Sequence, residues 1–358
     1  MNTASLLAIS DTTSAIRAGG AITEASSPEW ASLSLDFANP ALLSHWMSQA
    51  DCKLLLSNRR LIALGFAPQL GDADQENASL IAIPSDADVN VLLTLVQANP
   101  NAIGTLGSQL VNALEPAGQS LLNYLKLAEA LPAALVRPRQ NVDEPIALGP
   151  SLSLTAYHQA LAGSLSQVGD TPIPLEGVGA CRMHLFRDAL GNESHMAIEV
   201  GIRADLEQPT LVRVHSSCVT GDIFHSQRCD CGHQLNAALK TMAAEGHGVL
   251  VYLSQEGRGI GLNNKLKSYL LQQSGLDTVD GNLALGFGDD ERDFTYGKRI
   301  LQLMGIHSVR LLTNNPTKID TLSAQGINVV ERLPLIELHN EMAAQYVATK
   351  ARKSGHML

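Results

Sequence analysis

The stretch RVHSSCVTGDIFHSQRCDCGHQL, residues 213–235, gathers cysteines at the end of an apolar strand-like run. Cys218, Cys229 and Cys231 are three of the five cysteines in the chain, and a single residue separates the last two. Three thiolates at this spacing can hold one zinc ion and leave its fourth position open, whereas a structural zinc usually has four protein ligands. A zinc ion with an open position can activate water near neutral pH.

Other arrangements fit the same spacing. The cysteines could form a disulfide with a spare thiol, or part of a structural zinc site closed by His215, His225 or His233. An odd number of cysteines, three of them clustered, favours a reducing compartment and a metal over a disulfide framework. From the cysteines alone the open and closed metal sites remain alternatives, and the neighbouring motifs have to decide between them.

Composition indicates a globular protein. The 358 residues are 45% hydrophobic and 17% charged, which suits two domains with their own cores. The formal net charge of -10 disfavours nonspecific nucleic-acid binding. No apolar run approaches the ~20 residues of a membrane span, and the N-terminus lacks the pattern of a signal peptide. We therefore expect a cytoplasmic protein without nucleic-acid or membrane partners.

Apolar periodicity predicts an α/β fold of the mixed α+β kind, with two domains that each pack a sheet with helices. Helical spacing occurs at 41–50, 119–131, 235–246, 263–275 and 316–326. Short apolar runs predict strands at 52–57, 79–84, 249–254 and 308–313. Pro138, Pro145 and Pro150 interrupt these patterns. We divide the chain into a domain at 1–140, a linker at 141–165 and a domain at 166–358.

Two loops of the second domain suit a nucleotide. QEGRGIGL (255–262) follows a predicted strand; its glycines allow close backbone approach, and Arg258 can pair with phosphate. TNNPTK (313–318) also follows a strand and opens a helix, whose N-terminus favours anions. Taken singly, each loop, like the acidic run DDERDF (289–294), is as typical of a turn or a solvated face. No GxxxxGK[ST] motif is present, which disfavours a P-loop nucleotide hydrolase.

Together and in this order, the motifs resemble GTP cyclohydrolase II. The resemblance runs from about residue 171 to the C-terminus and is carried by RVHSSCVTGD, RCDCGHQL, QEGRGIGL, DTVDGN, LGFGDDERDF, LLTNNPTKI, GINVVERLPL and ATKARKSGHML. It implies zinc-dependent opening of the GTP imidazole ring, the first step of riboflavin biosynthesis. Formate and pyrophosphate would leave, giving 2,5-diamino-6-(5-phosphoribosylamino)pyrimidin-4(3H)-one.

The resemblance also implies a ligand set. Cys218, Cys229 and Cys231 would bind zinc. The GTP-binding positions of the family fall on Arg213, Val214, His215, Ser216, Ser217, Gln234, Glu256, Gly257, Arg258, Thr278, Thr313 and Lys318. By their chemistry, Gln234 and Glu256 suit the edge of guanine, and Arg258, Thr313 and Lys318 suit phosphates. Magnesium is expected with the triphosphate, and the protein is expected to be a homodimer.

Three further positions would carry the reaction. Tyr269 would assist ring opening near the zinc, although without the resemblance it is more typical of a core tyrosine. Asp290 matches the proton acceptor, and Arg292 matches a nucleophile toward the α-phosphorus. A guanidinium is almost always protonated, so Asp290 would have to take its proton. The more conservative role for Arg292 is electrostatic stabilisation of the departing pyrophosphate.

Two departures from the family pattern leave alternatives open. Ser217 stands where Glu is common, and FHSQRCDC replaces the usual FGSLRCDC, so His225 and Gln227 are atypical. No zinc ligand or catalytic side chain is lost. The alternatives are a paralogue with partial or altered nucleotide hydrolysis, and a GTP-sensing protein without turnover.

The first domain resembles, weakly, 3,4-dihydroxy-2-butanone 4-phosphate synthase through SAIRAGGAI, ANPALLSHWMSQADCKLLLSNRRLIALGF and PAGQSLLNYLKLAEALPAALV. In place of that family's acidic metal-binding stretch, TEASSPEWASLSL carries only Glu24 and Glu29. Gly118, Gln119 and Ser120 replace its Gly-His-Thr motif, and its last glutamate is missing from AALVRPR. Divalent-metal chemistry needs such ligands. We expect a folded, inactive domain that serves dimerisation, stabilisation or regulation.

Overall fold

The computed structural model describes residues 1–64, 77–83, 88–90, 92, 110–113, 117–192, 195–202, 208–324, 326–336, 348, 351–353, 355 and 357. The last residue of the strand predicted at 79–84 and part of the closing motif at 348–358 lie outside these residues. The chain forms two compact units. The first unit comprises Met1–Tyr157 and Ile260–Glu291, and the second comprises His158–Gly259 and Arg292–Leu358.

A seven-stranded sheet organises the first unit, in the order β5-β4-β3-β6-β2-β1-β7. Its strands are β1 (Ala21–Glu24), β2 (Ser27–Ser34), β3 (Lys53–Ser57), β4 (Ala78–Ala82), β5 (Leu110–Ala113), β6 (Ala133–Pro138) and β7 (Ile146–Gly149). Only β1 and β7 pair in parallel. The segment expected as a linker at 141–165 therefore supplies an edge strand, with Pro145 and Pro150 just outside its ends.

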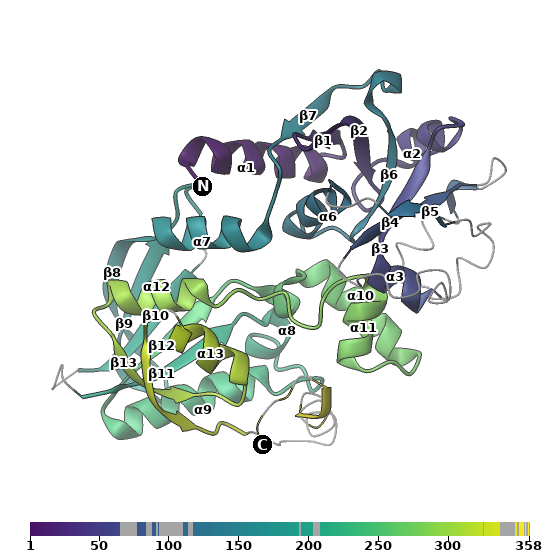
Figure 1. Ribbon diagram of the computed structural model, residues 1–358. Helices are drawn as coiled ribbons and strands as arrows, with labels where there is room; N and C mark the ends of the chain where they lie inside the picture. The colour runs from purple at the N-terminus through teal and green to yellow at the C-terminus, as the bar shows by residue number, and fades with distance from the viewer. Residues whose placement is uncertain are drawn as a thin grey trace. The chain divides into compact units, whose positions relative to one another are not determined.

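The first unit contains several helices, some of which are capped at the N-terminus by a side chain. They are α1 (Thr3–Arg17), α2 (Pro40–Met47), α3 (Asn58–Ala63), α6 (Ala117–Leu127), α10 (Leu262–Gln273) and α11 (Thr278–Leu285), with a 3-10 turn η2 (Arg139–Asn141). The side chains of Asn2, Asn39 and Ser57 accept hydrogen bonds from the first turns of α1, α2 and α3. Figure 1 shows α11 beside α3 and α10. α7 (Leu154–Ser164) crosses the unit boundary.

The second unit is built on a mixed seven-stranded sheet in the order β14-β13-β11-β12-β10-β9-β8. Its strands are β8 (Ser166–Leu175), β9 (Gly179–Arg187), β10 (His195–Gly201), β11 (Thr210–Ser216), β12 (His247–Leu253), β13 (Ser308–Leu312) and β14 (Asn328–Leu333). β8, β9 and β10 form an antiparallel meander. The four strands β12, β11, β13 and β14 are neighbours in this order and run parallel to one another.

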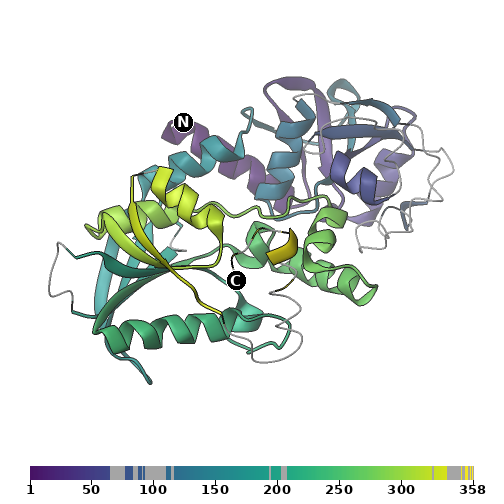
Figure 2. The same cartoon turned by 60° about the horizontal axis from the view of Figure 1, so that its bottom comes forward.

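Helices cover both faces of this second sheet. They are α8 (Val219–Asp222), α9 (Cys231–Glu245), α12 (Thr295–Leu303) and α13 (Pro316–Ala324), with a 3-10 turn η3 (Glu256–Gly259). Figure 2 shows α9 on one face and α12 and α13 on the other. The mixed α/β class, with a sheet and helices in each of two domains, is confirmed. No helix in the described part of the chain is long and apolar enough to cross a membrane.

A buried aromatic cluster in the second unit contains an unusual histidine. The rings of His195 and Tyr296 lie 4.5 Å apart between centroids, and His158 Nδ1 lies 3.0 Å from the Tyr296 hydroxyl. The backbone N–H of Ser254 donates to His195 Nδ1 at 3.2 Å. Burial lowers the pKa of His195 from 6.5 to about 4, so its ring is neutral in the folded protein at neutral pH.

Acid should therefore weaken the second unit through His195. The pKa of His195 is lower in the folded protein than in the unfolded chain. Its contribution to the free energy of unfolding is therefore fully present above pH 6.5 and is lost as the pH falls toward about 4. The loss is at most about 3 kcal/mol. His195→Asn keeps an acceptor for Ser254 but cannot titrate, so its denaturant midpoint should fall less steeply between these pH values. Equal slopes for the two proteins would contradict this assignment.

Candidate metal and nucleotide site

Three thiols converge at the carboxyl end of β11. Cys218 follows β11 as the residue before α8, and Cys231 is the first residue of α9. The Sγ atoms of Cys218 and Cys229 lie 3.7 Å apart, and all three sulfurs lie within 4.8 Å of one another. Among the described residues, no other group of three or more His, Cys, Asp or Glu side chains could hold a metal ion in this way. Three thiolates in one cluster match a zinc or other soft-metal site.

Gly221 allows the thiols to come this close. A Cβ atom at this position would lie 2.9 Å from Cys229 Sγ, a distance that real Cβ atoms hardly ever show, and 3.1 Å from Cys218 Sγ, which is also unusually tight. The loop needs a second glycine, since a Cβ at Gly232 would lie 2.2 Å from the carbonyl oxygen of Gly221. The two glycines therefore pack the start of α9 against the α8 turn.

Gly221→Ala should disrupt the metal site without removing a ligand. The added methyl group must push the sulfurs of Cys218 and Cys229 apart, so zinc content measured by plasma mass spectrometry should fall well below one ion per chain. Gly163→Ala is the matched control, because nothing lies within 4 Å of a Cβ at that helical position. If Gly221→Ala retains a full zinc complement, the close packing has no role in metal binding.

Crowding and burial favour the protonated thiol at Cys229 and Cys231. The hydrogen bond with the Cys218 thiol, together with burial, raises the pKa of Cys229 to about 11. Hydrogen bonds with the Cys218 and Cys229 thiols, together with burial, raise the pKa of Cys231 well above its ordinary value. Zinc binds thiolates, so binding would displace these protons.

Asp222 organises the turn that carries the first cysteine. Its carboxylate accepts from the backbone N–H of Cys218 at 3.0 Å and from the Tyr252 hydroxyl at 2.9 Å. His215 Nε2 lies 3.1 Å from the Asp222 Oδ1 atom, and the His215 and Tyr252 rings stack 5.6 Å apart. Sequence reasoning missed Asp222; the signal was an acid four residues after Cys218, where its side chain can turn back to the cysteine's N–H.

His215 is buried and leaves one ring nitrogen for a ligand. Its side chain is 3% exposed, and Nδ1 has no hydrogen-bond partner among the residues that the structure describes. Burial lowers the pKa of His215, while the hydrogen bond to Asp222 opposes that shift and the Arg213 cation adds to it. The neutral ring is therefore the favoured form, held in place by Asp222.

The loop at 255–262 adopts a left-handed turn. Gly257 and Arg258 have φ values of 64° and 63°, and Gly259 follows at 90°. For Arg258 this conformation costs about 1 kcal/mol, a strain that is common at ligand-binding loops. Glu256, just before it, accepts from the backbone N–H of Val219 at 2.6 Å. Glu256 thus ties this loop to the turn of Cys218.

Arg213 and Gln234 interact directly. Arg213 Nη2 donates to Gln234 Oε1 at 2.6 Å, and its Nη1 donates to the carbonyl of Leu312 at 2.9 Å. Gln234 Nε2 in turn donates to the carboxylate of Asp230, which lies between two of the cysteines. Burial lowers the pKa of Arg213 to about 10, so the group stays charged at neutral pH. These bonds join β11, β13 and α9 beside the thiols.

A second cation bonds to the backbone of β11. Lys318 Nζ donates to the carbonyl of Val214 at 2.7 Å and lies 5.1 Å from the centre of the Phe294 ring. The Arg292 guanidinium lies 5.2 Å from the same ring. Thr313 is buried, and its hydroxyl accepts from the backbone N–H of Asn315 at 3.1 Å at the start of α13. Arg213, Lys318 and Arg292 thus form a group of positive charges within the second unit.

The atypical residues of the cysteine loop fit without disturbing it. The Ser217 hydroxyl accepts from the backbone N–H of Gln255 at 3.1 Å, so a short side chain here joins β11 to the loop after β12. Ser216, its neighbour, ends β11. His225 has a φ of 51°, a conformation that favours glycine, and its side chain is exposed, as is that of Gln227. His225 therefore costs about 1 kcal/mol relative to an unstrained backbone.

Three predicted site residues belong to the first unit. Tyr269 lies on α10, half-buried, with Lys265 Nζ 5.8 Å from its ring centre. Thr278 is the first residue of α11, where Asp277 caps the helix, and Asp290 lies in the loop that follows α11. The remaining predicted residues and all three cysteines belong to the second unit.

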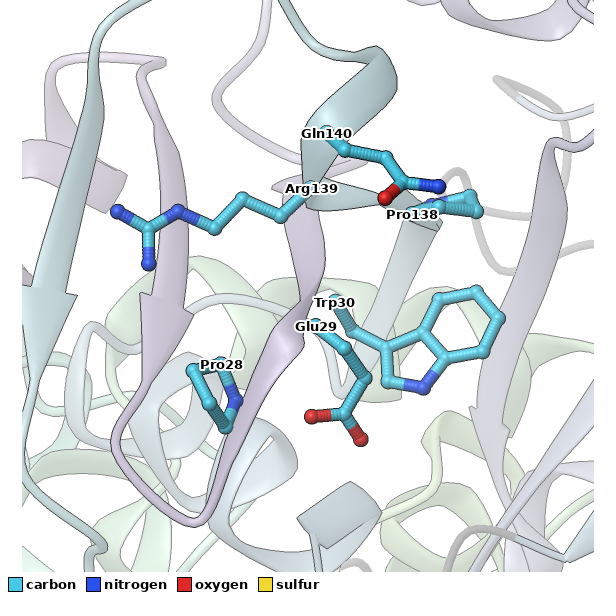
Figure 3. Close-up of a pocket in the computed structure, with 6 residues that line it drawn as sticks. All are labelled: Pro28, Glu29, Trp30, Pro138, Arg139 and Gln140. Atoms are coloured by element: carbon cyan, nitrogen blue, oxygen red, sulfur yellow. The ribbon is translucent and has the colours of Figure 1, made fainter.

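A separate hollow of about 500 Å³ lies in the first unit (Figure 3). It is lined by the start of β2 and the end of β6, through Pro28, Glu29, Trp30, Pro138, Arg139 and Gln140. Figure 3 shows the Arg139 and Trp30 side chains extending in different directions, with Glu29 as the single carboxylate drawn. One carboxylate beside a guanidinium is a poor divalent-metal site.

The second half of the chain matches a known protein family. A family model for GTP cyclohydrolase II matches residues 166–334. The GTP cyclohydrolase-2 of Neisseria gonorrhoeae is 51% identical over 194 residues, which cover 54% of this chain and 97% of that protein. The GTP cyclohydrolase-2 of Proteus mirabilis is 50% identical over 194 residues, which cover 54% of this chain and 96% of that protein.

Two further proteins are longer or less similar. The riboflavin biosynthesis protein RibBA of Endomicrobium trichonymphae is 45% identical over 205 residues, 57% of this chain and 50% of its own. A crystal structure of RibBX, a two-domain 3,4-dihydroxy-2-butanone 4-phosphate synthase from A. baumannii, aligns with 92% of this chain and 99% of its own at a TM-score of 0.30 and 16% identity. That likeness supports no inference, whereas the sequence identities do. The chain is a hydrolase and belongs to the GTP cyclohydrolase II family.

Proposed function

We propose that this chain opens the imidazole ring of GTP by hydrolysis, in a zinc-dependent reaction that releases formate and pyrophosphate. The product would be 2,5-diamino-6-(5-phosphoribosylamino)pyrimidin-4(3H)-one, and the reaction would be the first step of riboflavin biosynthesis. The observation that carries this proposal is the convergence of three thiols at the carboxyl end of β11, beside buried cations. Ligands of such sheets bind at that edge.

Cys218, Cys229 and Cys231 would hold the zinc ion, and their donor set fits it: three soft ligands leave one position open. The bound ion would supply Lewis-acid activation of water for attack on C8 of the guanine ring. Asp222 would keep Cys218 in place through its backbone N–H and would orient His215. His215 could then present Nδ1 to the nucleotide.

The triphosphate would meet the positive charges of the second unit. Arg213, Lys318 and Arg292 provide three cations, and Arg258 and the hydroxyl of Thr313 add donors. Magnesium would accompany the triphosphate and offset its remaining charge. Arg292 would stabilise the departing pyrophosphate, or act as nucleophile toward the α-phosphorus once Asp290 has taken its proton.

Guanine would be read by Glu256 and Gln234. The Glu256 carboxylate accepts from the backbone N–H groups of Val219 and Gly257, which fixes its position. An ionised carboxylate is an acceptor only, and acceptance from N1–H and the exocyclic amine would distinguish guanine from adenine. Val214, Ser216, Ser217, Gly257 and Thr278 would complete the contacts of the nucleotide, and Tyr269 would assist ring opening.

The first domain, residues 1–140, would be a degenerate synthase-like domain without synthase activity. Its retained carboxylates, Glu24 and Glu29, do not form a cluster: Glu24 accepts from the N–H and hydroxyl of Ser26, whereas Glu29 lines the hollow of Figure 3. We further propose that the protein works as a homodimer.

Metal removal tests the proposed function. Protein stripped with a chelator should release no formate from GTP, and one equivalent of zinc should restore release. Magnesium alone, added to the stripped protein, is the control and should restore nothing. Undiminished formate release from zinc-free protein would refute the zinc-dependent mechanism.

A further inference from the structure

Residues Ile260–Glu291 lie within the family match of 166–334, yet they fold into the first unit. This segment carries α10 and α11, and with them Tyr269 and Thr278. Two connections, at 259–260 and at 291–292, join it to the second unit. Its packing partners are therefore residues of the N-terminal region, which has no counterpart in the single-domain relatives that this chain matches over 97% of their length.

Apolar side chains of the segment enter the N-terminal core. Five of its residues belong to one core cluster and are at most 5% exposed: Ile260, Leu271, Ala284, Leu285 and Phe287. The same cluster contains N-terminal residues from β2, α2 and β3, among them Leu33, Trp46 and Leu54, each at most 1% exposed. Full burial of such side chains contributes about 1.5–3 kcal/mol each, so the segment and the N-terminal core stabilise each other.

A buried ion pair fixes α10, the helix of Tyr269. Lys267 Nζ lies 2.6 Å from Asp36 Oδ1, with side chains only 13% and 6% exposed. The other oxygen of Asp36 accepts from the backbone N–H of Leu131 at 2.7 Å, which holds the carboxylate still. One turn earlier, Asn264 Nδ2 donates to the carbonyl of Glu129 at 2.8 Å. Helix α10 is therefore held to the N-terminal region at two successive turns.

Two N-terminal side chains fix the end of α11. Arg60, 3% exposed, donates through Nη1 to the carbonyl of Ala284, and the Ser57 hydroxyl donates to the carbonyl of Gly286 at 3.0 Å. A Cβ at Gly286, whose φ is 96°, would lie 2.6 Å from the Ser57 hydroxyl. Both carbonyls belong to the C-terminal turn of α11, where helix carbonyls lack partners in the helix itself.

We propose that the N-terminal region is the positioning partner of the segment Ile260–Glu291, with Asp36 and Arg60 as positioning residues for Tyr269 and Thr278. The catalytic consequence rests on the proposed function. A displacement of about 1 Å in a reacting group can cost about a hundredfold in rate. On this proposal, the N-terminal region serves the reaction by holding, within the first unit, the two helices that carry Tyr269 and Thr278.

The test breaks the ion pair in the full-length, zinc-loaded protein. Asp36→Asn and Lys267→Met should each lower kcat for formate release by about tenfold to a hundredfold, with zinc content unchanged. The double variant should be no slower than the worse single variant, because one interaction is lost in all three. Asp51→Asn is the matched control: it breaks the Asp51–Arg137 pair of 2.9 Å in the same unit and should leave kcat unchanged.

Hydrogen–deuterium exchange separates this proposal from the proposed function. Asp36→Asn should speed amide exchange in α10 and leave α9 as in the wild type, whether or not the protein turns over GTP. If the wild-type protein releases no formate, the proposed function is refuted. The exchange measurement would still test whether Asp36 holds α10 in place. If Asp36→Asn changes neither the exchange in α10 nor kcat, Asp36 has no positioning role. If Asp51→Asn lowers kcat as much as Asp36→Asn does, the effect of Asp36 is one of general stability of the unit.

Discussion

Cys229→Ser is expected to abolish zinc binding and formate release together. Cys229 is 4% exposed, and its sulfur lies 3.7 Å from that of Cys218, so no other described side chain can take over its place in the cluster. A serine hydroxyl stays protonated where a thiol yields a thiolate, and two cysteines alone bind zinc far more weakly. We expect zinc content near zero and a loss of activity of at least about a thousandfold, because the metal generates the nucleophile.

A matched control separates loss of metal from loss of fold. Cys181 is also buried, at 6% exposure, and belongs to the core of the second unit rather than to the cluster. Cys181→Ser should lower the thermal midpoint but keep one zinc per chain and the wild-type kcat. Cys229→Ser, by contrast, should lose both its zinc and its formate release. A Cys229→Ser protein that is metal-free and fully active would rule out the zinc mechanism.

Tyr269→Phe is expected to leave GTP binding intact and to slow ring opening by about a hundredfold to ten-thousandfold, the usual contribution of a positioned proton donor. The substitution removes one hydroxyl from a half-buried ring and leaves its packing in place. The measurements are the dissociation constant of GTP by calorimetry and kcat by formate release. The first should change little and the second greatly.

Tyr124→Phe is the control for this substitution. It also removes a tyrosine hydroxyl from the first unit, one that donates to the carbonyl of Pro150 at 2.7 Å. It should lower stability by about 1 kcal/mol and leave kcat unchanged. An unchanged rate in Tyr269→Phe would assign Tyr269 to packing, the alternative that its place on an amphipathic helix allowed from the start.

Local structure and the metal cluster follow from the sequence because both depend on neighbours in the chain. Strand periodicity predicted β12 and β13, and a glycine in the left-handed region ends α9 at Gly246, as the pattern at 235–246 indicated. The two cysteines of CDC must lie close together, and the Gly221 turn brings Cys218 to them. The predicted strands and the helix end are confirmed, and the three cysteines lie together; their binding of zinc stays a prediction.

Long-range partners could not be predicted in the same way. The apolar face of α10 indicates that the helix packs on something, but its period does not say on which core, and the segment Ile260–Glu291 packs in the first unit. Similarly, the prolines around 146–149 indicate a break in the pattern without indicating that β7 pairs with β1. Glu256 was expected only at guanine, and its bond to Val219 depends on a crossing of two loops.

The most direct test is mass spectrometry of the products formed from GTP and magnesium by the purified, zinc-loaded full-length protein, alongside a formate assay. The proposed function predicts the diaminopyrimidine product with formate and pyrophosphate in equal amounts. A formylated intermediate or GMP alone would instead indicate altered hydrolysis. GTP that binds but is recovered unchanged would contradict the proposed function and indicate a nucleotide sensor.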